Sequence, residues 1–117
     1  MQASHLPIFR ITLSFCVYTE EVVKKLDRYY RYTLGADLRD KSKEILFLIH
    51  HASINKLERL ALLRQLRDKT EEMKVLIMLF EEMRAFHSFQ NFEYLSRQIV
   101  EICKQAQAWL NKTRASL

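Results

Sequence analysis

The chain has 117 residues, which fits a single domain able to bury one hydrophobic core without help from a metal or a disulfide. It contains one glycine and one proline, which excludes hairpin-rich β folds and glycine-rich phosphate loops, because these need positive or fixed φ angles at set points. The formal net charge of +5 favours polyanions as partners, although the same excess could serve solubility alone.

The absence of export and membrane signals predicts a cytoplasmic protein without membrane association. No apolar run approaches the ~20 residues of a membrane span. The first residues lack the basic region followed by an apolar core that marks a secretory signal. Cys16 and Cys103 both fall among apolar residues, so we expect two small buried side chains and no disulfide.

Apolar spacing predicts a first helix from about Pro7 to Asp27. Pro7 suits the first helical turn, where its missing N–H costs nothing. Intervals of three, four and seven define the expected inner face, which consists of Ile8, Ile11, Phe15, Val22 and Leu26, with Tyr18 filling a gap.

A junction at residues 28–32 precedes a second predicted helix, from Leu34 to about Ser53, with Thr33 as its expected N-cap. The expected inner stripe consists of Leu34, Leu38, Ile45, Ile49 and Ala52. The run 45–49 is apolar on every side of a helix, which is more than one inward face can use. We therefore expect a subunit interface here, with Leu46 and Phe47 as candidate residues.

The third and longest helix is predicted from about Lys56 to Phe86, a length of about 45 Å. Asn55 and Glu58 have the spacing of a capping box at its start. The expected core stripe consists of Leu60, Leu63, Leu66, Thr70, Met73, Ile77, Phe80 and Met83.

A tight break near His87 precedes a fourth predicted helix, from about Ser88 to Lys112. The residues expected to be buried are Phe92, Leu95, Ile99, Ile102, Ala106 and either Trp109 or Leu110. Helices of similar length joined by short connections pack beside their sequence neighbours in opposite directions. The sequence therefore predicts an all-α, antiparallel up-down-up-down four-helix bundle that spans residues 1–117 as one domain.

No arrangement typical of a metal site or an active site appears in the sequence. A di-iron bundle needs Glu-x-x-His pairs, but no glutamate stands three residues before His50, His51 or His87. Both cysteines fall on expected core faces, and His87 lies in a turn without an evident carboxylate partner. We expect a protein that is not an enzyme and holds no metal or cofactor.

The segment 31–35, which reads Arg-Tyr-Thr-Leu-Gly, resembles the basic-aromatic-Thr-Leu-Gly signature of the accessory variability determinant (Avd) proteins, which assist the reverse transcriptases of diversity-generating retroelements. The likeness continues through the apolar run 45–49, the Lys-Leu-Glu start at 56–58, and the segments 92–95 and 109–112 of the last helix. It covers nearly the whole chain from about Thr12 onward.

Two points leave the assignment open. Many Avd relatives carry Phe-Pro where this chain has Leu26 and Asp27, so the first helix could end later here. The four-helix proteins encoded in ribosomal-RNA intervening sequences share the fold and are an alternative family.

The Avd resemblance implies a homopentamer of four-helix protomers arranged as a barrel, whose basic surface contacts nucleic acid and the reverse transcriptase. It adds Thr33, Leu34 and Gly35 to Leu46 and Phe47 as candidate interface residues. Gly35 has no side chain and would let another backbone or side chain approach closely. The alternative is that the motif only starts a helix.

The candidate nucleic-acid-binding cations fall into three groups. Those in the first half of the third helix are Lys56, Arg59, Arg64, Arg67 and Lys74. Arg64, Arg67 and Lys74 lie near one face, but Glu71 interrupts that stripe and could pair with either Arg67 or Lys74. Arg28 and Arg31 form a second patch with the tyrosines between them, which could either stack on unpaired bases or simply cover the bundle end. Arg97 and Lys104 on the last helix are weaker additions.

The resulting hypothesis is an accessory subunit that binds template RNA or the RNA–cDNA complex and docks onto a reverse transcriptase to support mutagenic retrohoming. The rival hypothesis is a protein-interaction bundle of the ribosomal-RNA intervening-sequence type, whose positive charge is incidental.

Overall fold

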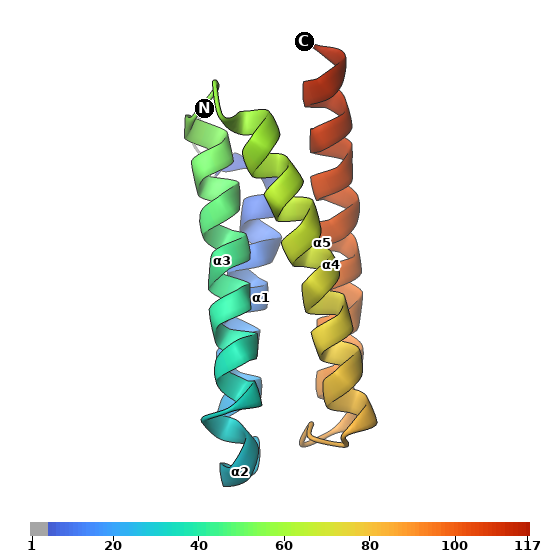
Figure 1. The fold of residues 1–117 in the computed structure, drawn as a ribbon. Coiled ribbons are helices and arrows are strands. Elements are labelled where there is room, and N and C mark those ends of the chain that lie inside the picture. The colour runs from blue at the N-terminus through green and yellow to red at the C-terminus, as the bar shows by residue number, and fades with distance from the viewer. Residues whose placement is uncertain (1–4) are drawn as a thin grey trace.

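The computed structural model describes residues 5–117, and nearly all of them are helical. Five helices follow one another along this range: α1 (Pro7–Lys24), α2 (Arg28–Arg31), α3 (Leu34–Ile54), α4 (Arg59–Glu82) and α5 (Phe89–Ala115). The four long helices pack into an elongated bundle with extents of 47 × 21 × 20 Å (Figure 1). The prediction of an all-helical four-helix fold is confirmed. None of the helices between residues 5 and 117 is both long enough and apolar enough to cross a membrane.

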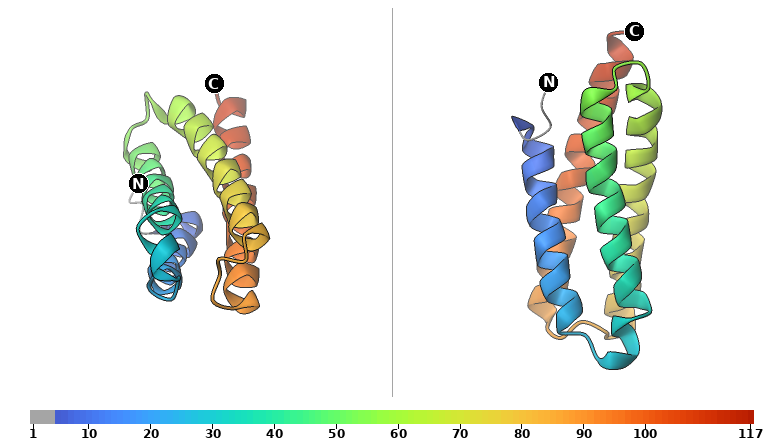
Figure 2. Two further views of the ribbon diagram at one scale, coloured as in Figure 1. Left: turned by 60° about the horizontal axis from the view of Figure 1, so that its bottom comes forward. Right: turned by 90° about the vertical axis from the view of Figure 1, so that its left-hand side faces the viewer.

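Each long helix packs against two of the others. Both α1 and α4 contact α3 and α5, while the short α2 contacts α3. The α3–α4 connection lies at the same end of the bundle as the start of α1 and the end of α5, and we call this the α3–α4 end (Figures 1 and 2). The opposite end, called the α2 end below, carries α2 and the α4–α5 connection.

The first helix ends three residues earlier than its apolar pattern predicts. Its last residue is Lys24, although Leu26 beyond it is still buried. Arg31 donates from Nη2 to the carbonyl oxygens of Lys24 (3.2 Å) and Leu26 (3.3 Å), which satisfies groups that a helix end leaves unpaired. This local contact from α2 allows the chain to leave the helix before Asp27.

Two threonines take interior positions of α1 that the apolar pattern did not assign. Thr12 and Thr19 are buried, whereas Ile11 and Tyr18 are only half-buried against the core. The threonine hydroxyls donate to the carbonyls of Ile8 (2.7 Å) and Phe15 (2.8 Å). A hydroxyl satisfied by its own helix can be buried at little cost.

The second predicted helix corresponds to α3, and its start differs from the prediction in one respect. Thr33 occupies the N-cap position, but its side chain does not cap α3. The Thr33 hydroxyl donates backwards instead, to the carbonyls of Tyr29 (3.1 Å) and Tyr30 (3.4 Å) at the end of α2. Of the predicted stripe only Leu34 is half-exposed, and the other four residues are fully buried.

The third helix is shorter at both ends than the predicted range of 56–86. Residues 56–58 form a turn in which the Asn55 side-chain oxygen accepts from the Glu58 N–H at 3.1 Å. Its last residue is Glu82, so its 24 residues span about 36 Å. Arg84 has a left-handed φ of 54°, and the Ala85 N–H bonds back to the Phe80 carbonyl at 3.0 Å. Because the chain reverses there without a glycine, no stop signal marks this helix end in the sequence.

The core of α4 otherwise follows the prediction, except that Leu60 is half-buried and Met83 is exposed. In α5, Ser88 caps the helix by accepting from the Asn91 N–H at 3.3 Å. The helix runs three residues beyond the predicted end at Lys112. Leu110 is fully buried and Trp109 half-buried, which resolves the alternative left open by the sequence.

Candidate nucleic-acid interface

The formal positive charge is concentrated at the α3–α4 end. Three segments meet there: residues 5–10, 54–64 and 108–117. They contain six of the 19 Lys and Arg residues but only one of the 14 Asp and Glu residues, namely Glu58. Thirteen residues of each sign remain elsewhere, so this end carries the whole net charge of +5. The six cations are Arg10, Lys56, Arg59, Arg64, Lys112 and Arg114.

Arg59 is held in place at this end by the last turn of α3. Its Nε donates to the Ala52 carbonyl at 2.7 Å and its Nη2 to the Ser53 carbonyl at 3.1 Å. A cation near a helix C-terminus is favoured by the partial negative charge of the free carbonyls. The sequence predicted Arg59 as a nucleic-acid ligand, but the structure gives it a structural role as well.

The predicted cation stripe along α4 is divided by ion pairs. Arg64 is exposed and makes no ion pair within residues 5–117. Arg67 lies 3.3 Å from a carboxylate oxygen of Asp68, and Lys74 lies 3.0 Å from Glu71. The hydrogen bond that Lys74 donates to Glu71 raises the pKa of Lys74. Of the two partners that the sequence left open for Glu71, the structure shows Lys74, and Arg67 pairs with Asp68 instead.

Lys41 on α3 and Lys69 on α4 form ion pairs between these two helices. The Glu72 carboxylate accepts from Lys41 at 2.7 Å and from Lys69 at 3.5 Å, while Lys69 also lies 3.3 Å from Glu44. The hydrogen bond from Lys41 and its charge lower the pKa of Glu72. These cations each have an acidic partner beside them. The unpaired positive charge of α4 therefore lies at its start, in the α3–α4 end.

The second predicted patch, formed by Arg28, Arg31 and their tyrosines, lies at the α2 end, far from the start of α4 along the 47 Å bundle. Arg28 is exposed, but the Arg31 side chain is occupied by the carbonyls at the end of α1. Tyr29 and Tyr32 are 79% and 72% exposed, respectively. The structure thus does not bring the two predicted patches together, and Arg31 serves α1 more directly than a ligand.

The two predicted cations of α5 lie away from both ends. Arg97 lies 3.3 Å from a carboxylate oxygen of Glu93 on the same helix. Lys104 is exposed, and both residues line a shallow groove with Ile11 of α1. They neither join the α3–α4 end nor form a separate cluster.

Four residues that sequence reasoning did not select complete the α3–α4 end. Arg10, Lys112 and Arg114 add to its charge, and Trp109 lines a pocket between the helix ends. Arg10 comes from the first helix and the other three from the last, and the packing of α1 against α5 brings them to the same end of the bundle. The one sequence feature that could have pointed to this site is the presence of Lys112 and Arg114 close together near the end of the last helix.

The five candidate interface residues differ in how far their side chains are exposed to solvent. Gly35 is buried within its own chain, where Val23, Leu26 and the carbonyl of Tyr30 enclose it, so it is not open to a second copy. Phe47 is 56% exposed in the middle of α3, and Leu46 is half-buried. Thr33 is exposed, and Leu34 is half-buried. Gly35 therefore permits close approach inside the protomer.

The cysteines and histidines form no chemical cluster in the described part of the chain. Cys16 donates to the Ser42 carbonyl at 3.3 Å, and burial raises the pKa of both the Cys16 and the Cys103 thiols. The rings of His50 and His51 lie 5.3 Å apart, both exposed. Within residues 5–117 no three His, Cys, Asp or Glu side chains are grouped so that they could hold a metal.

Neither a comparison with protein-family models nor a search of curated proteins finds a match for this sequence. By its architecture the protein is an all-helical bundle of four long helices. Its particular feature is one strongly basic end built from three separate segments of the chain.

Proposed function

We propose that this protein is a non-enzymatic, Avd-like accessory subunit of a diversity-generating retroelement. It binds template RNA or the RNA–cDNA complex at its α3–α4 end and docks onto the retroelement reverse transcriptase to support mutagenic retrohoming. The concentration of the entire net charge at one end of the bundle carries this proposal, because a focused positive field attracts phosphate backbones and releases their counterions.

Three further features belong to the proposal. The helices run in antiparallel, up-down-up-down order, five copies assemble as a barrel, and the assembly acts in the cytoplasm. Successive connections at alternate ends of the bundle support the helix order. An exposed Phe47 on α3 supports a contact between copies, since a large aromatic side chain gains from burial. Repetition in a ring would multiply the basic field of one protomer.

The test is RNA binding across a salt series with charge-neutralised variants. The end variant carries Lys56→Gln, Arg64→Gln and Lys112→Gln, three exposed cations of the α3–α4 end. We expect it to bind single-stranded RNA more weakly and with a shallower salt dependence. Removing one cation that touches a phosphate lowers the slope by about 0.7, so the triple change should lower it by about 2.

A matched control removes the same amount of charge elsewhere. Lys24→Gln, Lys25→Gln and Lys43→Gln neutralise three exposed cations outside the α3–α4 end. This control should retain most of the affinity and nearly the original slope. Equal losses of affinity in the two triple variants would show that net charge, and not the basic end, determines binding.

A second candidate function is protein–protein interaction without a specific role for nucleic acid, as in the ribosomal-RNA intervening-sequence type. It is favoured by large apolar side chains that stand exposed around the bundle, including Phe47 on α3 and Val75 and Met78 on α4. Partner binding through such surfaces depends little on salt, whereas binding to a polyanion weakens steeply as salt rises. The salt series therefore separates the two functions.

A further inference from the structure

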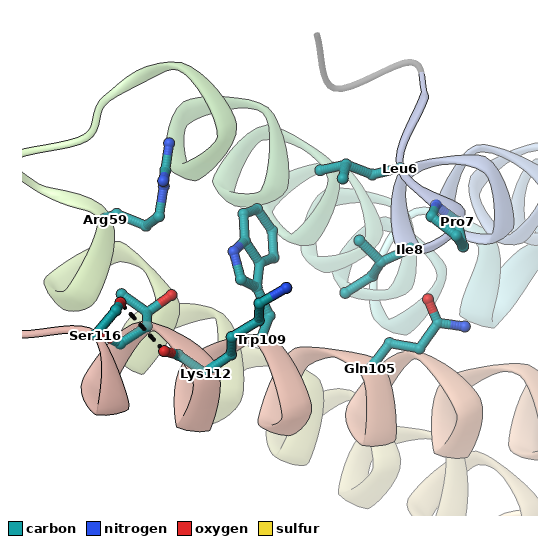
Figure 3. A pocket seen from close by; sticks show the side chains of 9 residues that line it. Leu6, Pro7, Ile8, Arg59, Gln105, Trp109, Lys112 and Ser116 are labelled. Atoms are coloured by element: carbon teal, nitrogen blue, oxygen red, sulfur yellow. Dashed lines mark hydrogen bonds between the residues drawn. The ribbon is translucent and has the colours of Figure 1, made fainter. Parts of the chain in front are cut away.

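The α3–α4 end holds a pocket of about 320 Å³ between the start of α1, the start of α4 and the end of α5. Figure 3 shows the Trp109 ring standing away from α5, with Arg59 of α4 on one side and Leu6 and Ile8 on the other. Lys112 also lines the pocket. We call it the Trp109 pocket.

Trp109 packs at the edge of the bundle core and is not part of its buried centre. Its neighbour Leu110 is fully buried and fills the interior position of this helical turn. Trp109 is only half-buried and offers part of its indole to the pocket beside Leu6 and Ile8. A large flat ring beside an apolar wall is the kind of surface on which a nucleobase stacks.

The charges around the pocket have one sign. Among the described residues that line it, Arg59 and Lys112 are cations and none is Asp or Glu. Arg59 is fixed by its bonds to the Ala52 and Ser53 carbonyls, whereas Lys112 is exposed and can move toward a ligand. The pocket therefore combines an aromatic ring with two cations, which suits a ligand that has both a flat base and a phosphate.

The size of the pocket limits what can enter. A volume of about 320 Å³ is at the lower end of the range for small-molecule sites, enough for one nucleotide and too little for a duplex end. Inside a duplex both faces of a base are covered by its neighbours, and a terminal base pair is too large for the pocket, so an unpaired base is the group that can stack on the Trp109 ring.

We propose that the Trp109 pocket binds one unpaired nucleotide of an RNA strand. The base lies against the indole of Trp109, and its phosphate lies near Lys112 and Arg59. This inference rests on the proposed RNA-binding function and assigns to it a specific contact.

Fluorescence tests the proposal directly, because Trp109 is the only tryptophan of the chain. The probes are a single-stranded hexa-adenylate RNA and adenosine 5′-monophosphate, with ribose 5-phosphate as the control that lacks a base. We expect both probes to quench Trp109 emission saturably and ribose 5-phosphate to leave it unchanged. Quenching by the hexamer should follow the same binding curve as a gel shift.

Two variants extend the measurement to affinity. Trp109→Leu should weaken hexamer binding by about fivefold or more, the lower range for the loss of one base stack, whereas Trp109→Phe should keep most of the affinity. Phe89→Leu is the matched control, since Phe89 is an exposed aromatic residue at the opposite end. Circular dichroism checks that each variant keeps its helices.

The outcomes separate this inference from the proposed function. Salt-sensitive RNA binding without quenching of Trp109, and unchanged by Trp109→Leu, would overturn the pocket and leave the proposed function standing. No RNA binding at low salt would overturn both. Equal quenching by ribose 5-phosphate, or by a peptide with a free carboxylate, would show an anion site that does not recognise a base and would also overturn the inference.

Discussion

Gly35 is the residue on which the meeting of α1, α2 and α3 depends. A Cβ atom at this position would lie 3.1 Å from each of three atoms: Leu26 Cδ1, Val23 Cγ1 and the carbonyl oxygen of Tyr30. One of these is backbone, which cannot rotate away. The absence of a side chain therefore lets α3 start close against the end of α1 and against α2.

We predict that Gly35→Ala lowers the free energy of unfolding by about 1 kcal/mol, because overpacking costs about 1–3 kcal/mol and outweighs the helix propensity gained. Urea denaturation measures the change. Ala108→Gly, at an exposed position of α5, gives the ordinary alanine-to-glycine difference in this bundle. If Gly35→Ala instead stabilised the protein by that difference, the close contact of α3 with α1 and α2 at Gly35 would not contribute to stability.

Among the elements, the connection between α3 and α4 is organised by Arg59. The sequence between the two helices contains neither glycine nor proline, yet the chain turns within residues 55–58. The Arg59 guanidinium binds two carbonyls of the preceding helix end, and the Asn55 side chain accepts from the Glu58 N–H. Side-chain contacts thus replace the usual turn residues.

We predict that Arg59→Lys costs about 1–2 kcal/mol of stability although it keeps the charge, because an ammonium group cannot make both forked hydrogen bonds. Amide hydrogen exchange should accelerate at the end of α3 more than in α5. The control is Arg64→Lys, an exposed change on the same helix, expected to stay within about 0.5 kcal/mol. Similar losses of stability in the two variants would show that the Arg59 hydrogen bonds do not hold the α3–α4 connection in place.

Over the molecule as a whole, charge and apolar surface are distributed differently. The net charge lies at one end, whereas large exposed apolar side chains occur both at that end, as with Leu57, and along the sides, as with Phe47 on α3 and Met78 on α4. The proposed barrel uses the exposed side of α3 around Phe47 for contacts between copies, which would leave the basic end open to RNA.

We predict that light scattering coupled to size-exclusion chromatography gives a molar mass of about 70 kDa, five times the protomer mass of 14.1 kDa. Phe47→Glu should shift it to a smaller species, since a carboxylate cannot be buried between copies at low cost. Lys43→Glu, one helical turn away and also exposed, should leave the mass unchanged. A wild-type monomer at micromolar concentration would contradict the barrel.

Local spacing was enough to predict the helical class, the number of long helices and most of the core, because a 3.6-residue apolar period in a chain with one glycine and one proline permits little else. Residues such as Phe15, Ile45, Met73 and Ile99 were assigned correctly to the interior. Their burial follows from their positions along the helix and needs no knowledge of the partner helices.

The helix ends depend instead on specific side-chain contacts, and the grouping of the cations depends on three-dimensional packing. The ends of α1 and α3 are held by Arg31 and Arg59, which bind carbonyls five to seven residues earlier in the chain, and an apolar period does not predict such side-chain contacts. The basic end joins Lys56 to Lys112, which are far apart in sequence, and ion pairs remove Arg67 and Lys74 from the predicted stripe. Periodicity specifies which face of a helix turns inward, but partners across helices are chosen by packing.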